Sequence, residues 1–144
     1  MRLITTTLVI AALATTAFAH GGVRNAAVKA RMDVMVTIKD ATGVLGNMAK
    51  GSTPYDAAQA AAAKAALIAA GAQVVPLFEA QEKDPKSEAL PVIWKQWDDF
   101  AVKSANMVKA AEQIDTASLD GIRGTLGPLA KSCRQCHAKY RIEK

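Results

Sequence analysis

Residues 23–50 read VRNAAVKARMDVMVTIKDATGVLGNMAK. Apolar side chains recur there every three or four residues, at Val28, Met32, Met35, Ile38, Leu45 and Ala49. This spacing places them on one face of an α-helix, with charged residues off that face. Gly51 follows as a helix stop. The segment therefore predicts a long amphipathic helix that needs other helices to cover its apolar face.

A second helix is predicted after Gly51. Thr53 is the expected N-cap, Pro54 the first helical position, and Asp56 an acid that favours the positive end of the helix dipole. Ten alanines follow between positions 57 and 70, which allows close packing against a neighbouring helix. The helical pattern weakens at Gly71 and Pro76.

Two further helices complete the predicted fold. One starts near Pro91 and continues to Ile114; the other starts after Thr116 or Ser118 and runs to about Ile142. Glycines and a proline interrupt the last segment and predict a bend, at Gly121, Gly124, Gly127 and Pro128. No stretch alternates as a strand does. We therefore predict an all-α, antiparallel up-down-up-down four-helix bundle.

Residues 1–19 have the three parts of a secretory signal peptide. A positive start is followed by an apolar run from Leu3 to Ala17, and Ala17-Phe18-Ala19 is a cleavage site with small residues at both positions that matter. An uncleaved membrane anchor is the alternative, although the apolar run is near the lower length limit for spanning. No other stretch is long and apolar enough to span. We expect cleavage after Ala19, a periplasmic protein without stable membrane insertion, and one domain over residues 20–144.

The composition bounds the remaining function classes. The chain has 144 residues, 51% of them hydrophobic but only 5% aromatic, and a formal charge of +5. Thirty residues are alanine, so few large apolar side chains remain to fill a core. Two cysteines exclude a disulfide-rich scaffold. A mild positive charge without a basic run does not indicate nucleic-acid binding and is compatible with docking onto acidic proteins.

The chemistry is concentrated at Cys133-Arg134-Gln135-Cys136-His137. The spacing C-x-x-C-H is the attachment motif of c-type haem: on a helix the two thiols lie on one side, and the histidine presents an imidazole to the iron. A redox disulfide is the first alternative, but it belongs near a strand–helix junction. Zinc is the second, and it wants four ligands where only these three and the distant His20 are present. We predict one covalent haem c, with His137 as an axial ligand.

The residues alone leave the other face of the iron open. The candidates for a second axial ligand are four methionines, Met32, Met35, Met48 and Met107, and an absent ligand is the further possibility. Met48 lies at the wrong end of the first predicted helix. A methionine on such a stripe is more often a core residue than a ligand.

The chain after residue 19 resembles the class II c-type cytochromes, the cytochrome c′ family with its low-spin relatives. The resemblance rests on Cys133-x-x-Cys136-His137-x-x-Tyr140-Arg141, on Arg31, on Lys50-Gly51, and on Pro91-x-x-Trp94. It implies a four-helix bundle with haem near the C-terminus. In low-spin members a methionine of the first helix is the sixth ligand, and one turn after Arg31 that position is Met35.

The resemblance also implies roles for residues around the haem. Arg31 would lie near the haem propionates, Arg141 beside the proximal histidine, and Trp94 and Tyr140 in the walls of the pocket. Members of the family are often homodimers through the first two helices, so a homodimer is expected as a possibility here.

Two functions follow from these predictions. The first is a single-electron carrier between redox partner proteins, with iron held by His137 and Met35; no enzymatic activity is expected. The alternative is a five-coordinate, cytochrome c′-like protein that binds nitric oxide or carbon monoxide. Peroxidation ranks third, because no histidine on the distal side is available as an acid–base catalyst. The scarcity of bulky side chains is explained if haem fills part of the core, and the apo-protein is then expected to fold poorly.

Overall fold

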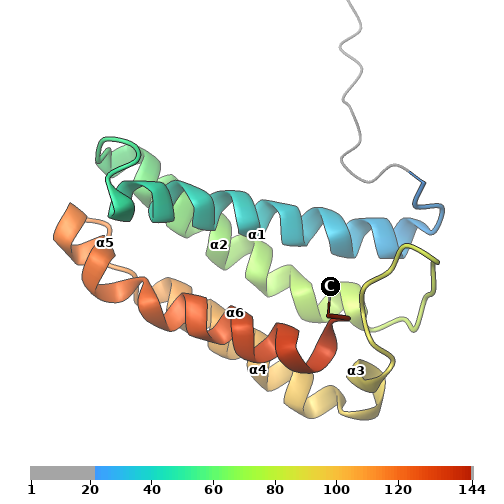
Figure 1. Cartoon of the computed structure of the whole chain (residues 1–144). Coiled ribbons are helices and arrows are strands. Elements are labelled where there is room, and N and C mark those ends of the chain that lie inside the picture. Colours follow the sequence, from blue (N-terminus) through green and yellow to red (C-terminus); the bar gives the residue numbers. More distant parts are fainter. Residues whose placement is uncertain (1–21, 144) are drawn as a thin grey trace, which may run out of the picture.

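The computed structural model describes residues 22–143, and within them all regular elements are helices (Figure 1). They are α1 (Ala26–Lys50), α2 (Ala57–Phe78), α3 (Val92–Lys95), α4 (Trp97–Glu112), α5 (Leu119–Thr125) and α6 (Gly127–Tyr140). The predicted all-helical fold is confirmed. The expected signal peptide, its cleavage site and His20 lie outside the described residues.

Both ends of α1 follow from its sequence. The side chain of Asn25 accepts a hydrogen bond from the Val28 amide and caps the start. At the other end Gly51 adopts a left-handed conformation, with φ of 75°. Its amide and that of Ser52 then reach the last carbonyls of the helix. Gly51 therefore ends the helix as predicted.

The boundaries of α2 differ from the prediction. The N-cap is Asp56, whose carboxylate accepts from the Gln59 amide, and Thr53 and Pro54 precede the helix. The helix also continues through Gly71 and Pro76 to Phe78. Asp56 prevails because it stands directly before the alanine run, whose residues are the better helix formers.

Among the described residues, α2 is also the one helix long and apolar enough to cross a membrane by length and composition alone. This corrects the expectation that no stretch after the leader would pass that test. A third of its most apolar window is buried, and the helix packs against both α1 and α4.

The third and fourth predicted helices are each divided in two. Gln96, with φ of −129° and ψ of 46°, interrupts the third and separates α3 from α4. The fourth divides at Leu126, just before Gly127 and Pro128, so the predicted bend is present. Ser118 is the N-cap of α5, where its hydroxyl accepts from the Gly121 amide.

The long helices pack in order around the bundle: α1 on α2, α2 on α4, and α4 on α6 (Figure 1). The start of the fourth segment, α5, packs against α1 at what we call the far end, where α1 stops and α2 begins. The core there consists of side chains that are fully buried, namely Leu45, Met48, Ala60, Ala111, Ile114 and Ile122. The opposite end, where α1 starts and α6 stops, carries the cavity described next, and we call it the cavity end.

Candidate functional site

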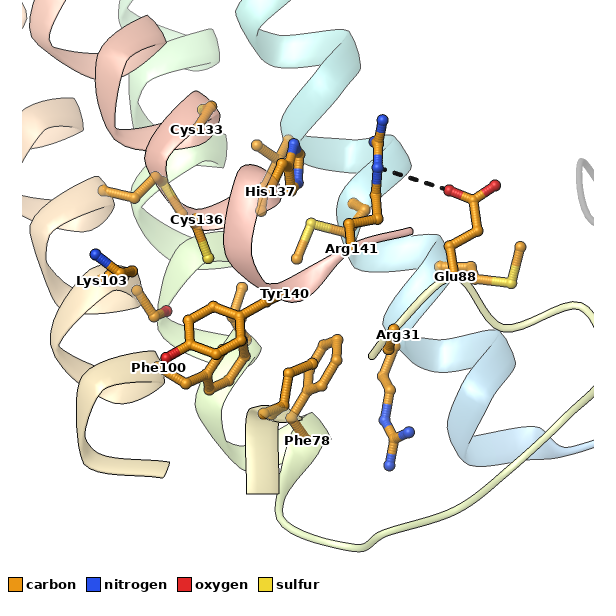
Figure 2. Close-up of a pocket in the computed structure, with 18 of the residues that line it drawn as sticks. Arg31, Phe78, Glu88, Phe100, Lys103, Cys133, Cys136, His137, Tyr140 and Arg141 are labelled. Atoms are coloured by element: carbon orange, nitrogen blue, oxygen red, sulfur yellow. Dashed lines mark ion pairs between the residues drawn. The ribbon is translucent and has the colours of Figure 1, made fainter. Parts of the chain in front are cut away.

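A cavity of about 660 Å³ occupies the cavity end of the bundle. Residues of α1, α2, α3, α4 and α6 line it, together with a short piece of the irregular chain between α2 and α3. Cys133, Cys136 and His137 all belong to its wall (Figure 2). The three predicted haem-binding residues therefore share one cavity.

The helix α6 places these three side chains by its periodicity. Residues three and four apart lie on neighbouring parts of one helix face, which brings Cys133, Cys136 and His137 together. Both thiols are free and half-buried, and burial raises the pKa of each. Burial lowers the pKa of the His137 imidazole, and the Arg141 cation lowers it further. His137 is therefore held neutral near pH 7, the form in which a nitrogen lone pair can bind a metal.

The wall opposite α6 comes from the first half of α1. It is mainly apolar and includes Val28, Met32, Met35 and Val36. Met107 of α4 also lines the cavity, whereas Met48 is buried at the far end. Three of the four candidate methionines thus face the cavity, and Met35 is among them.

Arg31 lies in the cavity wall, but its guanidinium is engaged elsewhere. It donates to the backbone carbonyls of Leu77, Ala80 and Glu82 and lies over the rings of Phe78 and Trp94. Only 3% of Arg31 is exposed, and Figure 2 shows its guanidinium pointing away from His137. The arginine therefore binds the carbonyl end of α2 to α1. The predicted contact with a haem propionate stays a prediction.

Trp94 is placed differently from the prediction. It does not line the large cavity, and it lies instead in the wall of a smaller neighbouring hollow of about 350 Å³. Its indole Nε1 donates to the carbonyl of Phe78 at 2.7 Å. The tryptophan thus supports Arg31 and the end of α2 from behind, which corrects its assignment to the pocket wall.

Tyr140 does line the cavity, as predicted, and it is held on several sides. Its ring packs edge-on against Phe100 with centroids 5.4 Å apart. Its hydroxyl donates to the Asp99 carboxylate at 2.5 Å, which also accepts from Lys139 at 2.9 Å. These bonds hold the last turn of α6 against α4, and they lower the pKa of Asp99.

Arg141 follows the end of α6 and lines the cavity next to His137. Its Nε lies 3.8 Å from a carboxylate oxygen of Glu88, the pair marked in Figure 2. The resemblance to the family implied the arginine beside the histidine, but no pattern in the sequence indicated the acid, which lies far away along the chain.

The residues present fit a haem group. The cavity volume lies within the roughly 300–1,000 Å³ usual for cofactor pockets, and most of its walls are apolar. Two free thiols and a neutral imidazole open into it, which is the donor set of a c-type attachment. Within residues 22–143 no three His, Cys, Asp or Glu side chains come together as a site for a bare metal ion.

Several residues of the cavity were missed by sequence reasoning. Phe78 and Phe100 form an aromatic wall, and Lys103 and Ser104 add polar groups from α4. The spacing of Phe100, Ser104 and Met107 along one helix face was a usable signal. Ser87, Glu88 and Ala89 carry no local signal, because only the tertiary fold brings that loop to the cavity.

Comparison with known proteins adds independent findings. A family model described as Cytochrome C′ matches residues 26–141. A cytochrome c-554 of Cereibacter sphaeroides is 37% identical over 121 residues, covering 79% of each chain. A cytochrome c-556 of Agrobacterium tumefaciens is 36% identical over 129 residues, covering 88% of this chain and 99% of that one. A cytochrome c′ of Alcaligenes xylosoxydans is 31% identical, covering 82% and 94%.

Solved structures agree with this fold. A cytochrome c′ from Rhodobacter Spheriodes superposes with a TM-score of 0.75 at 25% identity, covering 82% of this chain and 96% of that one. A nitric oxide complex of a mutant cytochrome c prime from Alcaligenes xylosoxidans gives 0.73 at 28% identity, covering 81% and 94%. The four-helix bundle and the bound cofactor, haem c, are thereby confirmed.

The predicted electron-carrier function is wrong. Similar solved proteins are cytochromes c′, and several of these structures are complexes with nitric oxide. This agrees with the alternative named from the sequence and not with a low-spin haem held by His137 and Met35. A methionine one turn after Arg31 does not by itself indicate an iron ligand, because a thioether is also an ordinary apolar wall group.

Proposed function

The chain belongs to the cytochrome c′ family, and from this premise we propose that it is a haem protein that binds nitric oxide or carbon monoxide at a five-coordinate iron. The single observation that carries the proposal is its similarity to a solved cytochrome c prime in complex with nitric oxide. We propose no enzymatic activity.

On this proposal α6 holds the cofactor. Cys133 and Cys136 would form the two thioether bonds, and the neutral imidazole of His137 would be a ligand of the iron. When bound, the haem would supply an iron that can take up a diatomic gas. The role of the chain is to fix that group and to shape the opposite face.

The α1 wall suits a small neutral ligand. Val28, Met32 and Met35 present apolar groups to the cavity, and the guanidinium of Arg31 is bound to backbone carbonyls. Lys39, the remaining charged residue of α1 in the lining, pairs with Asp40 at 3.3 Å, so α1 presents a mainly apolar surface to the ligand. Met35 keeps its predicted place beside the iron in this proposal, as part of the wall that an entering gas contacts.

The wider surface supports proposals about partners. Exposed charges on α6 are all cationic, at Lys131, Arg134 and Lys139, so an acidic partner protein would be attracted to this face. The outward face of α2 carries small, uncharged side chains. The exposed alanines there are Ala58, Ala61, Ala62, Ala65 and Ala69. This face supports a homodimer through α1 and α2.

Export completes the proposal. Residues 1–19 carry the pattern of a cleaved signal peptide, and a periplasmic location after cleavage at Ala19 follows from it. The mass of the mature protein with its haem, measured by mass spectrometry, tests both the cleavage site and the covalent attachment.

Absorbance spectra of the purified holoprotein test the gas-binding function. We expect broad bands in both oxidation states, and a reduced spectrum that sharpens when carbon monoxide or nitric oxide is added. Met35→Leu, which keeps the apolar wall, should leave these spectra nearly unchanged. Two observations together would contradict the proposal. One is a set of sharp bands in the reduced protein that do not change when carbon monoxide is added. The other is a weak absorbance band at the red end of the spectrum that is lost in Met35→Leu.

A further inference from the structure

Residues 79–91, the irregular chain between α2 and α3, close one side of the haem cavity, and we call this segment the strap. Ser87, Glu88 and Ala89 of the strap lie in the cavity wall, together with residues from five helices. The strap and Arg141, which follows the end of α6, are therefore the parts of the wall, within the described residues, that lie outside the helices.

The first half of the strap is fixed to α1. Arg31 donates to the carbonyls of Ala80 and Glu82. The carboxylate of Asp84 accepts from the amides of Arg24 and Asn25 at 2.8 and 3.0 Å. These bonds hold the strap at the start of α1 and leave its second half to reach the end of α6.

The second half is aligned with the end of α6 by backbone pairing. The Leu90 amide donates to the Tyr140 carbonyl and the Ile142 amide to the Glu88 carbonyl, both at 2.9 Å. These two bonds flank the antiparallel bridge between Ala89 and Arg141. The backbones of Glu88 and Arg141 are thereby set in register beside the turn that carries His137.

The two side chains then meet at the cavity wall. Arg141 Nε is 3.8 Å from Glu88 Oε2, with side-chain exposures of 48% and 29%. Figure 2 shows Arg141 between His137 and Glu88. Both residues line the same cavity as His137, and the Arg141 amide donates to the His137 carbonyl at 3.1 Å. A cation, Arg141, thus lies beside His137, and an acid, Glu88, lies close enough to hold that cation in place.

We propose that Glu88 is a positioning residue, which holds the Arg141 guanidinium beside His137 and so sets the charge that the iron ligand experiences. Glu88 acts through Arg141 and not by itself. The inference rests on the proposed function only in taking His137 as the ligand of the haem iron.

This arrangement predicts the direction of change in the reduction potential. A cation near the iron disfavours its oxidised form and raises the potential. Glu88→Gln releases the guanidinium from its place beside His137 and is therefore expected to lower the midpoint potential, as Arg141→Gln is. Because Glu88 acts through Arg141, adding Glu88→Gln to Arg141→Gln should shift the potential by less than half of the shift seen with Arg141 present.

The experiment is a double-mutant cycle on gas-free holoprotein, read by spectroelectrochemical titration. The iron–histidine stretching frequency from resonance Raman spectra of the reduced proteins is the second readout, and it should follow the same pattern. Glu82→Gln is the matched control, since Glu82 belongs to the strap but does not line the cavity. It should leave both readouts unchanged.

Two outcomes overturn the inference: an equal shift with Glu88→Gln in both backgrounds, or no shift in either. Where Glu88→Gln fails to retain haem, Glu88→Asp is compared in the same two backgrounds under the same criterion. A wild-type protein that binds neither gas would overturn the proposed function, and the potentials would still decide the role of Glu88.

Discussion

Helices α1, α2 and α4 run through both ends of the bundle, but the space between the helices is filled differently at each end. At the far end, small and aliphatic side chains such as Ala60, Leu45 and Ile122 are fully buried, and the helices close on one another. At the cavity end the same helices enclose about 660 Å³ bordered by Phe78 and Phe100. Alanine lets helices approach, whereas the cavity end keeps them apart for a cofactor. The far end is therefore complete without haem, and the cavity end is not.

Removing the haem is expected to have the largest effect, and to act on the cavity end alone. In the Cys133→Ala/Cys136→Ala variant no thioether bond forms, and the apolar cavity walls lose their filling. We expect the largest loss of stability of any change considered, with fast hydrogen exchange in the first half of α1 and in α6. Amides of the far end should keep slower exchange. Mass-resolved hydrogen exchange measures both, and equal exchange rates at the two ends would contradict the comparison.

Leu45→Ala tests the far end alone. Leu45 is fully buried, and such truncations cost about 2–5 kcal/mol of unfolding free energy through lost burial and a new void. Chemical denaturation of the holoprotein measures this loss. The absorbance spectrum should not change, because the residue is remote from the haem cavity; an altered spectrum would show that the two ends are coupled.

Arg31→Met tests what holds the cavity end together. The substitution keeps most of the side-chain volume but leaves three backbone carbonyls without their donor. We expect a loss of about 1–3 kcal/mol in unfolding free energy, as for buried polar groups that lose a partner. Arg123→Met is the control at the far end, since Arg123 is half-exposed and donates to a single carbonyl, that of Ala49. Equal losses of unfolding free energy in the two variants would show that the buried hydrogen bonds of Arg31 stabilise the protein no more than the exposed one of Arg123.

Gly71→Ala and Gly43→Ala form a matched pair of smaller effects. A Cβ at Gly71 would lie 2.8 Å from Met107 Cε and from Val108 Cγ2, whereas a Cβ at Gly43 meets nothing within 4 Å. We expect Gly71→Ala to cost about 1–3 kcal/mol and to push Met107 toward the haem, which the affinity for carbon monoxide should report. Gly43→Ala should stabilise α1 by up to about 1 kcal/mol. Thermal unfolding that reverses this order would refute the packing argument.

The smallest effect concerns acid stability at the strap. Hydrogen bonds from the backbone amides of Asn25, Lys86 and Arg24 lower the pKa of Asp84 in the folded protein. The stabilisation is present above the carboxyl pKa of the unfolded chain, about 3.9, and is lost as the pH falls through the lower folded value. Asp84→Asn should therefore flatten the loss of stability below about pH 4. Denaturation midpoints measured at a series of acid pH values check this, and an unchanged slope would rule it out.

Local patterns in the sequence were sufficient for much of the fold. The stripe of α1, the stop at Gly51 and the spacing of Cys133, Cys136 and His137 each depend on residues within a few turns, so they could be predicted. The N-cap of α2 was misplaced by three residues because Thr53 and Asp56 have similar capping chemistry. The break at Gln96 has no glycine or proline to announce it.

The contacts around the cavity could not be predicted in the same way. Arg31 and its carbonyl partners are more than forty residues apart, and Glu88 meets Arg141 only after the strap has been fixed. For Met35 the limit is chemical: the same thioether serves as an iron ligand or as an apolar wall, and its position on a helix face does not distinguish the two.

The short pairing of the strap with the end of α6 also has a kinetic consequence. Contacts between distant parts of a chain form late, because the loop between them must first close. Helices α1 and α2 are neighbours in sequence and can associate early, whereas the bridge between Ala89 and Arg141 must wait for α4, α5 and α6. The haem side of the protein is then the last part to become native, which leaves the thiols of α6 accessible during the interval in which the cofactor has to be attached.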